Sequence, residues 1–92
     1  MEKGWKKFVG LCHQEESVNK LDALLRLLLT PEEQEQLGRR ILLIEELLKG
    51  AKTQREIARD LKISIAKITR GSNNLKLIDQ EMRAYLLEKL VK

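Results

Sequence analysis

The chain has 92 residues, and 18 basic against 14 acidic side chains give it a net charge of +4 at pH 7. This length fits a single domain, 1–92, whose core is so small that a partner subunit is expected. With a single cysteine, the chain cannot form an intrachain disulfide. The single histidine is adjacent to that cysteine, so the two do not have the spacing of a zinc-binding pair. No stretch approaches the roughly 20 apolar residues of a membrane span. Nor does the start resemble a signal peptide, so we expect a cytoplasmic protein without metal or membrane contact.

Three helices are expected in the first half of the chain, because aromatic residues and proline are scarce and Leu, Glu and Lys abound. The first two cover about 4–17 and 20–29. Thr30-Pro31-Glu32-Glu33 has the pattern of a capping box, with proline at the first helical position. A third helix should follow over 31–49 and end at Gly50.

The second and third of these helices are apolar around most of their circumference. A helix of this kind must be buried on most sides, and a monomer of this size offers little to cover it. The alternative is a compact monomer with exposed leucines. We therefore predict an interlocked homodimer, from these residues: Leu21, Leu24, Leu25, Leu27, Leu28 and Leu29, then Leu37, Ile41, Leu42, Ile44, Leu47 and Leu48.

The segment 54–78 has the spacing of a helix-turn-helix. Thr53 and Glu56 form a second capping box, the short helix that follows should end near Leu61, and Ser64 can cap another helix to about Leu77. Asp79 can cap a last helix over 80–91. The residues expected to face inward are Ile57, Ala58 and Leu61 on the first helix, Ile63 in the turn, and Ile65, Ile68, Ser72 and Leu75 on the second.

Charge supports a nucleic-acid partner for this segment. Between Ala51 and Ile78 there are seven basic residues against two acidic ones, and no acid lies from Leu61 to Ile78. The outward side of the second helix is small, polar and cationic, as a major-groove reading helix requires. A solvated basic face on an ordinary helical hairpin is the alternative.

Two positions depart from regular patterns. Lys62 stands where such turns often have glycine, and a left-handed conformation there would cost on the order of 1 kcal/mol. Gly71 lies inside a predicted helix, where glycine costs roughly 1 kcal/mol relative to alanine. It suggests the close approach of a ligand ring or of a neighbouring helix.

Three groups of residues carry a family resemblance. The run from Ile65 to Asn73, with Ile-Thr-Arg-Gly-Ser-Asn at its end, resembles the bacterial tryptophan repressor family, as do Gln54-Arg55-Glu56 and Leu29-Thr30-Pro31. Further matches in register are Trp5, Phe8-Val9, Leu37-Gly38, Arg40 and Glu45-Glu46-Leu47-Leu48. The resemblance spans essentially the whole chain. It implies an all-α, six-helix intertwined homodimer that binds L-tryptophan as corepressor and then palindromic operator DNA, repressing tryptophan biosynthesis or transport genes.

The resemblance also implies individual roles. Arg40 and Arg70 would sandwich the indole ring, which suits planar guanidinium groups. Gly71 would let the ring approach the helix, the backbone carbonyls of Leu27 and Leu29 would accept from the ammonium group, and Thr30 would lie beside the pocket. Asn74 stands where the best-known members have serine. The positions matched to DNA contact are Gln54, Arg55, Ile65, Ala66, Lys67, Thr69, Arg70, Asn73 and Lys76.

Other functions differ in how well the residues fit them. Enzyme activity is not expected, because Cys12 and His13 are adjacent in a helix and point to different sides. A ligand-independent helix-turn-helix regulator and a repressor answering a different small ligand remain alternatives. An RNA-binding or assembly module would lack aromatic stacking platforms.

Overall fold

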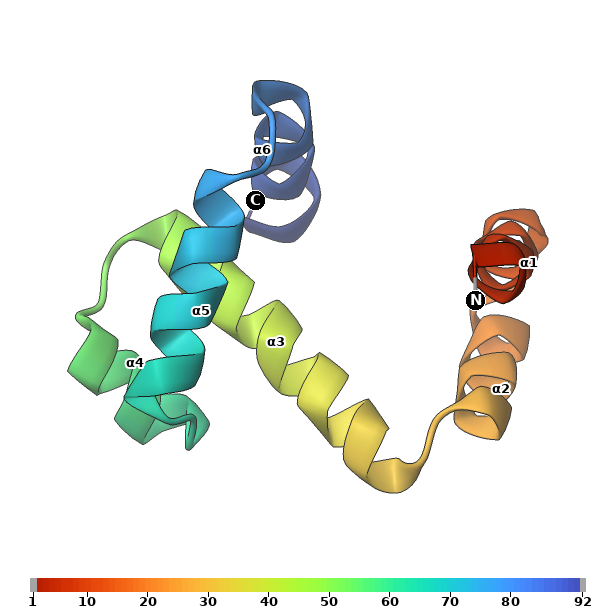
Figure 1. The fold of residues 1–92 in the computed structure, drawn as a ribbon, viewed down its shortest axis with the longest axis horizontal. Coiled ribbons are helices and arrows are strands. Elements are labelled where there is room, and N and C mark those ends of the chain that lie inside the picture. The colour runs from red at the N-terminus through yellow and green to blue at the C-terminus, as the bar shows by residue number, and fades with distance from the viewer. Residues whose placement is uncertain (1, 92) are drawn as a thin grey trace. The chain divides into compact units, whose positions relative to one another are not determined.

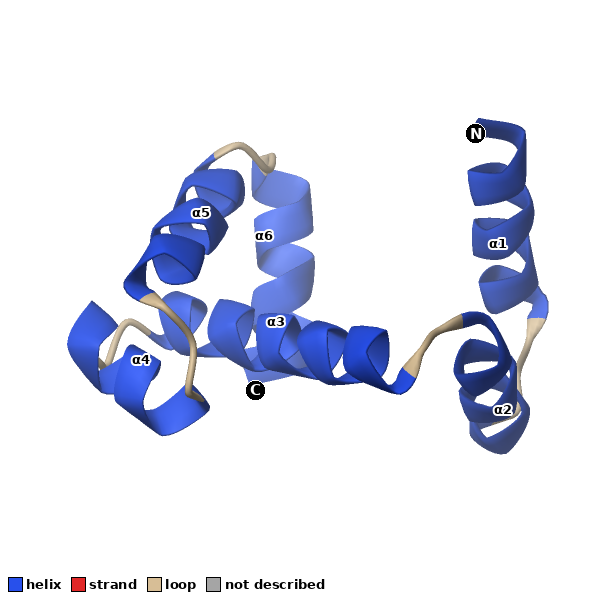
Figure 2. Ribbon diagram, turned by 60° about the horizontal axis from the view of Figure 1, so that its bottom comes forward, coloured by secondary structure: helices blue, strands red, loops and turns tan. Residues whose placement is uncertain are grey.

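The computed structural model describes residues 2–91 and is all-helical, as predicted (Figure 2). The chain divides into two compact units, one ending at Gln34 and the other starting at Glu35. The helices are α1 Glu2–Gln14, α2 Val18–Leu28, α3 Pro31–Lys49, α4 Gln54–Leu61, α5 Ile65–Lys76 and α6 Gln80–Leu86, followed by the π-helical segment η1 Leu87–Val91. Within these residues no helix is long and apolar enough to cross a membrane.

The capping residues were predicted correctly. Thr30 and Glu33 exchange two hydrogen bonds, of 2.8 and 3.1 Å, at the start of α3. Thr53 and Glu56 do the same at the start of α4. Such reciprocal bonds satisfy backbone donors that have no partner inside the helix. Because all these atoms lie within three residues of one another, the sequence pattern was sufficient to locate both helix starts.

Two expected boundaries were wrong. The first helix ends at Gln14 rather than Ser17, because the Ser17 side chain caps α2 by accepting from Lys20 N at 3.3 Å. The second helix therefore begins at Val18 instead of Lys20. The last helix is capped by Asp79 as predicted, but it is not uniform over 80–91, since its final turn is π-helical.

The first unit contains α1 and α2, and none of the described residues of either helix is buried. Cys12 is half-buried and His13 is exposed, so these adjacent side chains differ in their surroundings. The aromatic rings of Trp5 and Phe8 lie 5.6 Å apart on α1. Leu27 and Val18 are 80% and 79% exposed.

The second unit is built around a small apolar cluster. Figure 1 shows α4 and α5 beside the carboxyl-terminal half of α3, with α6 following α5. The cluster takes one buried residue from each helix and one from the turn: Leu43, Ile57, Ile68 and Ile63. Leu47, Ala58 and Leu61 pack against it, half-buried. The prediction of Ile57 and Ile63 as core residues of a helix-turn-helix is confirmed.

One inward-facing assignment was wrong. Ile65 is 46% exposed, whereas Ile68 on the same helix is fully buried and Leu75 is buried. Ile65 is the first residue of α5, directly after the cap Ser64, so its side chain lies at the edge of the cluster. The apolar stripe of α5 therefore begins at Ile68.

Candidate ligand groove and DNA-binding surface

The corner between α4 and α5 depends on a left-handed residue. Lys62 has φ 55° and ψ 47°, and its backbone N–H donates to Ala58 O. Ile63 N also donates to Ala58 O, at 3.1 Å. A side chain in this conformation costs on the order of 1 kcal/mol, and the buried Ile63 side chain offsets that cost. The turn thus connects the two helices of the predicted helix-turn-helix without a glycine.

The outward surface of this helix pair contains all nine positions matched to DNA contact, and every one of them is exposed. Gln54 and Arg55 open α4, while the other seven positions follow one another along α5 from its first to its last turn. Among the described residues, none of these side chains takes part in an ion pair. The four cations are therefore free to pair with phosphates, as a DNA-contacting surface requires.

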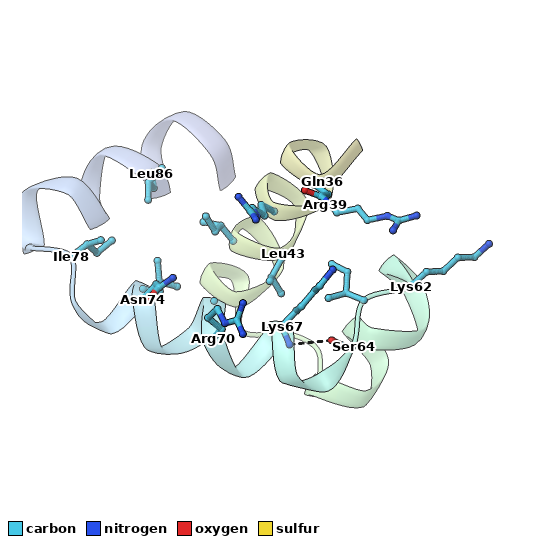
Figure 3. A pocket seen from close by; sticks show the side chains of 15 residues that line it. Gln36, Arg39, Leu43, Lys62, Ser64, Lys67, Arg70, Asn74, Ile78 and Leu86 are labelled. Atoms are coloured by element: carbon cyan, nitrogen blue, oxygen red, sulfur yellow. Dashed lines mark hydrogen bonds between the residues drawn. The ribbon is translucent and has the colours of Figure 1, made fainter. Parts of the chain in front are cut away.

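A groove of about 690 Å³ lies between α5 and α3, and Lys67 and Arg70 belong both to its lining and to the positions matched to DNA contact. Figure 3 shows Ile78 and Leu86 at one end of the groove and Lys62 at the other. The complete lining is Gln36, Arg39, Arg40, Leu43, Ile44, Lys62, Ile63, Ser64, Lys67, Arg70, Gly71, Asn74, Leu75, Ile78 and Leu86. Five of these residues are cationic and none is acidic, so the groove suits an apolar body that carries an anionic group.

Four of the seven residues expected at the ligand lie on this groove. Arg40 comes from α3, and Arg70, Gly71 and Asn74 come from α5. Leu27, Leu29 and Thr30 belong to the first unit and are not among the residues that line the groove. Their predicted contact with a ligand stays a prediction.

Gly71 is explained by a neighbouring helix. A Cβ atom built on Gly71 would lie 2.9 Å from Leu43 Cδ2, which is closer than real Cβ contacts. The missing side chain therefore allows α3 and α5 to pack closely. Of the two explanations offered by the sequence, the close approach of a helix is the one that this contact supports, and Gly71 still contributes to the groove wall.

Sequence reasoning did not assign two cations and one leucine of the lining to the groove, namely Arg39, Lys62 and Leu86. Arg39 is half-buried, pairs with Glu35 at 2.6 Å, and lines the groove beside Arg40. Lys62 lines it from the turn, and Leu86 contributes from α6. The local pattern marked Lys62 for the turn only, and no pattern marked Arg39 or Leu86, because a place at the groove depends on how α3, α5 and α6 pack.

One lysine outside the groove, Lys52, forms ion pairs that shift pKa values near the helix-turn-helix. Lys52 Nζ lies 3.0 Å from Asp60 Oδ2 and 3.4 Å from Glu46 Oε2. The hydrogen bonds to Asp60 and then Glu46 raise the pKa of Lys52 above its ordinary 10.5. Hydrogen bonds from Lys52 and then Arg59 lower the pKa of Asp60 below its ordinary 3.8.

Comparison with known proteins shows which family the chain resembles. The family model described as Trp repressor protein matches residues 3–90. The Trp operon repressor homolog of Vibrio vulnificus is 44% identical over 82 residues, covering 89% of this chain and 80% of that protein. The homolog of Photobacterium profundum is 40% identical over 88 residues, covering 96% and 85%. That of Chlamydia trachomatis serovar D is 39% identical over 89 residues, covering 97% and 95%.

These matches cover nearly all of the described chain, including the helix-turn-helix and both walls of the groove. The resemblance drawn from the motif around Arg70 is thereby confirmed. The chain belongs to the Trp repressor family, a family of DNA-binding transcription regulators.

Proposed function

We propose that this chain is a transcriptional repressor that binds palindromic operator DNA as a homodimer when L-tryptophan occupies the groove between α3 and α5. The genes it represses would serve tryptophan biosynthesis or transport. The observation that carries the proposal is that Arg40 and Arg70 line one groove from opposite helices. Two planar guanidinium groups suit the two faces of an indole ring.

The groove also suits the other parts of the ligand. Its apolar floor includes Leu43 and Leu75, and its cations match a carboxylate. The Asn74 side chain has a carboxamide oxygen that can accept a hydrogen bond from an ammonium group. The family resemblance also implies that the backbone carbonyls of Leu27 and Leu29 accept from the ammonium group and that Thr30 lies beside the ligand.

The regulatory step in this proposal is a change in geometry. A ring held between Arg40 and Arg70 would brace α5 against α3 and hold the recognition helices of a dimer about 34 Å apart, one turn of DNA. The ligand strengthens DNA binding only to the extent that it binds this arrangement more tightly than arrangements that do not bind DNA.

Titration calorimetry with L-tryptophan tests the ligand. We expect saturable binding at one ligand per subunit, and binding weaker by about 2- to 30-fold in Arg40→Leu and Arg70→Leu, if each stacking contact contributes about 0.5–2 kcal/mol. Arg59→Leu is the matched control, because Arg59 lies on α4 and does not line the groove. Unchanged binding in correctly folded Arg70→Leu would contradict the proposed pocket.

DNA binding is tested separately. Duplexes are selected from a randomised pool by the wild-type protein, once with and once without L-tryptophan. The proposal expects palindromic duplexes that bind more tightly when tryptophan is present. Equal affinity in both conditions would instead identify a ligand-independent regulator.

One observation favours a second candidate, a repressor that answers a different small ligand. Asn74 lines the groove, and its side chain is larger than the serine of the best-known members. No heat with L-tryptophan, together with DNA binding that persists, would support this candidate. It would leave the fold and the DNA-binding surface unchanged.

A further inference from the structure

Lys52 lies in the connection between α3 and α4 and contacts an acidic residue on each helix. Its Nζ is 3.4 Å from Glu46 Oε2 near the end of α3 and 3.0 Å from Asp60 Oδ2 in the last turn of α4. Lys52 belongs neither to the groove lining nor to the positions matched to DNA contact. The contacts therefore call for an explanation of their own.

Neighbouring cations do not make the same connection. Lys49 contacts Glu45 and Glu46, all within α3, at 3.6 and 3.8 Å. Arg59 contacts Asp60, its neighbour on α4, at 3.2 Å. Among the ion pairs of residues 2–91, those of Lys52 alone link α3 to α4.

This link adds to the apolar packing of α4, whose buried Ile57 shares one cluster with Leu43 of α3. The one buried residue of α4 is Ile57, and the main helical neighbour of α4 is α5. The first turn of α4 is tied to α3 through the short connection that contains Lys52. The Glu46–Lys52–Asp60 bridge links the last turn of α4 to the end of α3, so both ends of α4 are held.

Exposed ion pairs contribute little on average, but this bridge differs from an isolated pair. The Glu46 side chain is only 16% exposed, and one lysine serves two carboxylates, so a single side chain is immobilised for two contacts. The raised pKa of Lys52 and the lowered pKa of Asp60 agree with a formed bridge.

We propose that Lys52 is a positioning residue for DNA binding, which holds α4 at a fixed angle to α3 so that Gln54 and Arg55 are presented together with the outward face of α5. This inference rests on the DNA-binding part of the proposed function, and it does not depend on the identity of the ligand. It predicts that breaking the bridge loosens α4 and weakens DNA binding even when the net charge is unchanged.

The decisive variant is Lys52→Met combined with Asp60→Asn, because its net charge equals that of the wild type. If Lys52 acted only by attracting phosphates, restoring the net charge would restore the affinity. If it acts by positioning, the double variant binds the selected duplex about 2- to 5-fold more weakly than wild type. Lys52→Arg should keep the bridge and the affinity.

Lys49→Met serves as the matched control, since it removes one positive charge from the same cluster without breaking the link to α4. Amide hydrogen exchange of α4 supplies a readout without DNA. We expect faster exchange across 57–61 in Lys52→Met and in the double variant, but not in Lys49→Met, at a similar global unfolding midpoint.

Wild-type affinity in the double variant, or wild-type exchange across α4, would overturn the positioning role. Failure of the wild-type protein to select any duplex would count against the proposed function, and the exchange measurement would still decide whether Lys52 holds α4. The two failures are therefore distinguishable.

Discussion

The two units of this chain differ in how far they bury their apolar residues. In the first unit, α1 and α2 have no buried residue, and Trp5, Val18 and Leu27 are all more than 60% exposed. The second unit, by contrast, buries Ile57 and Ile68 almost completely. Each unit is rich in Leu, Ile or Val, so composition does not separate them.

Both units leave apolar side chains exposed, and these include Leu37, Ile41 and Leu42 of the second unit. The second unit has a cluster of its own that holds the helix-turn-helix together. The first unit leaves apolar side chains in water, at a cost of about 25 cal/mol for each Å² that burial would remove. We infer that a second subunit covers these side chains, in agreement with the predicted homodimer.

The largest effect is expected from substitutions that break the inferred interface. Leu27→Glu with Leu28→Glu places carboxylates on neighbouring sides of α2, and an uncompensated charge in an interface costs about 3–5 kcal/mol. Sedimentation should show a dimer for the wild type and a monomer for this variant. Lys20→Glu, an exposed polar position on the same helix, should leave the dimer intact. A variant that sediments as the wild type does would contradict the inference.

A second prediction compares two isoleucines of the second unit. Ile68→Ala should lower the free energy of unfolding by about 2–5 kcal/mol, because it opens a cavity in the cluster. Ile65→Ala should cost about 1 kcal/mol or less, since Ile65 is 46% exposed. Denaturant unfolding of both variants measures the difference. Equal losses would show that Ile65 is buried in solution.

A third comparison uses two helical glycines. Gly71→Ala should destabilise by about 1 kcal/mol, because overpacking against Leu43 exceeds the gain in helix propensity. Gly38→Ala should stabilise by up to about 1 kcal/mol, since nothing lies within 4 Å of the added Cβ. Opposite shifts in the unfolding midpoint are expected. Stabilisation by both substitutions would mean that Leu43 moves aside at no cost.

The smallest expected effect is on the free energy of unfolding at acid pH. A hydrogen bond from the Thr53 backbone N–H is the main cause that lowers the pKa of Glu56 below its ordinary 4.5, and the Lys52 contact lowers that of Asp60 below 3.8. A carboxyl group whose pKa is lowered by folding stabilises the protein at pH values above its ordinary pKa. This stabilisation is lost as the pH falls through the pKa of the folded state.

Unfolding free energy should therefore fall below about pH 4.5, and Asp60→Asn should flatten the part of that decline that lies below pH 3.8. The raised pKa of Lys52 acts at the other extreme, where stability is lost only as the pH rises beyond 10.5. Superimposable acid limbs for wild type and Asp60→Asn would contradict the bridge in solution.

The sequence by itself determined the local features of this protein. The starts of α3, α4, α5 and α6 follow from capping side chains that bond to backbone groups three residues away. The end of α3 follows from Gly50, which has φ +65°. The family also follows from sequence, because the motif around Arg70 is contiguous.

Only the tertiary structure decided the remaining features. It moved Ile65 to the surface, placed Leu43 against Gly71, and added Arg39 to the groove that Arg40 and Arg70 line. It also joined Glu46 to Asp60 through Lys52. The physical reason is range: a cap joins atoms a few residues apart, whereas these contacts join separate helices and exist only after α3, α4 and α5 have packed.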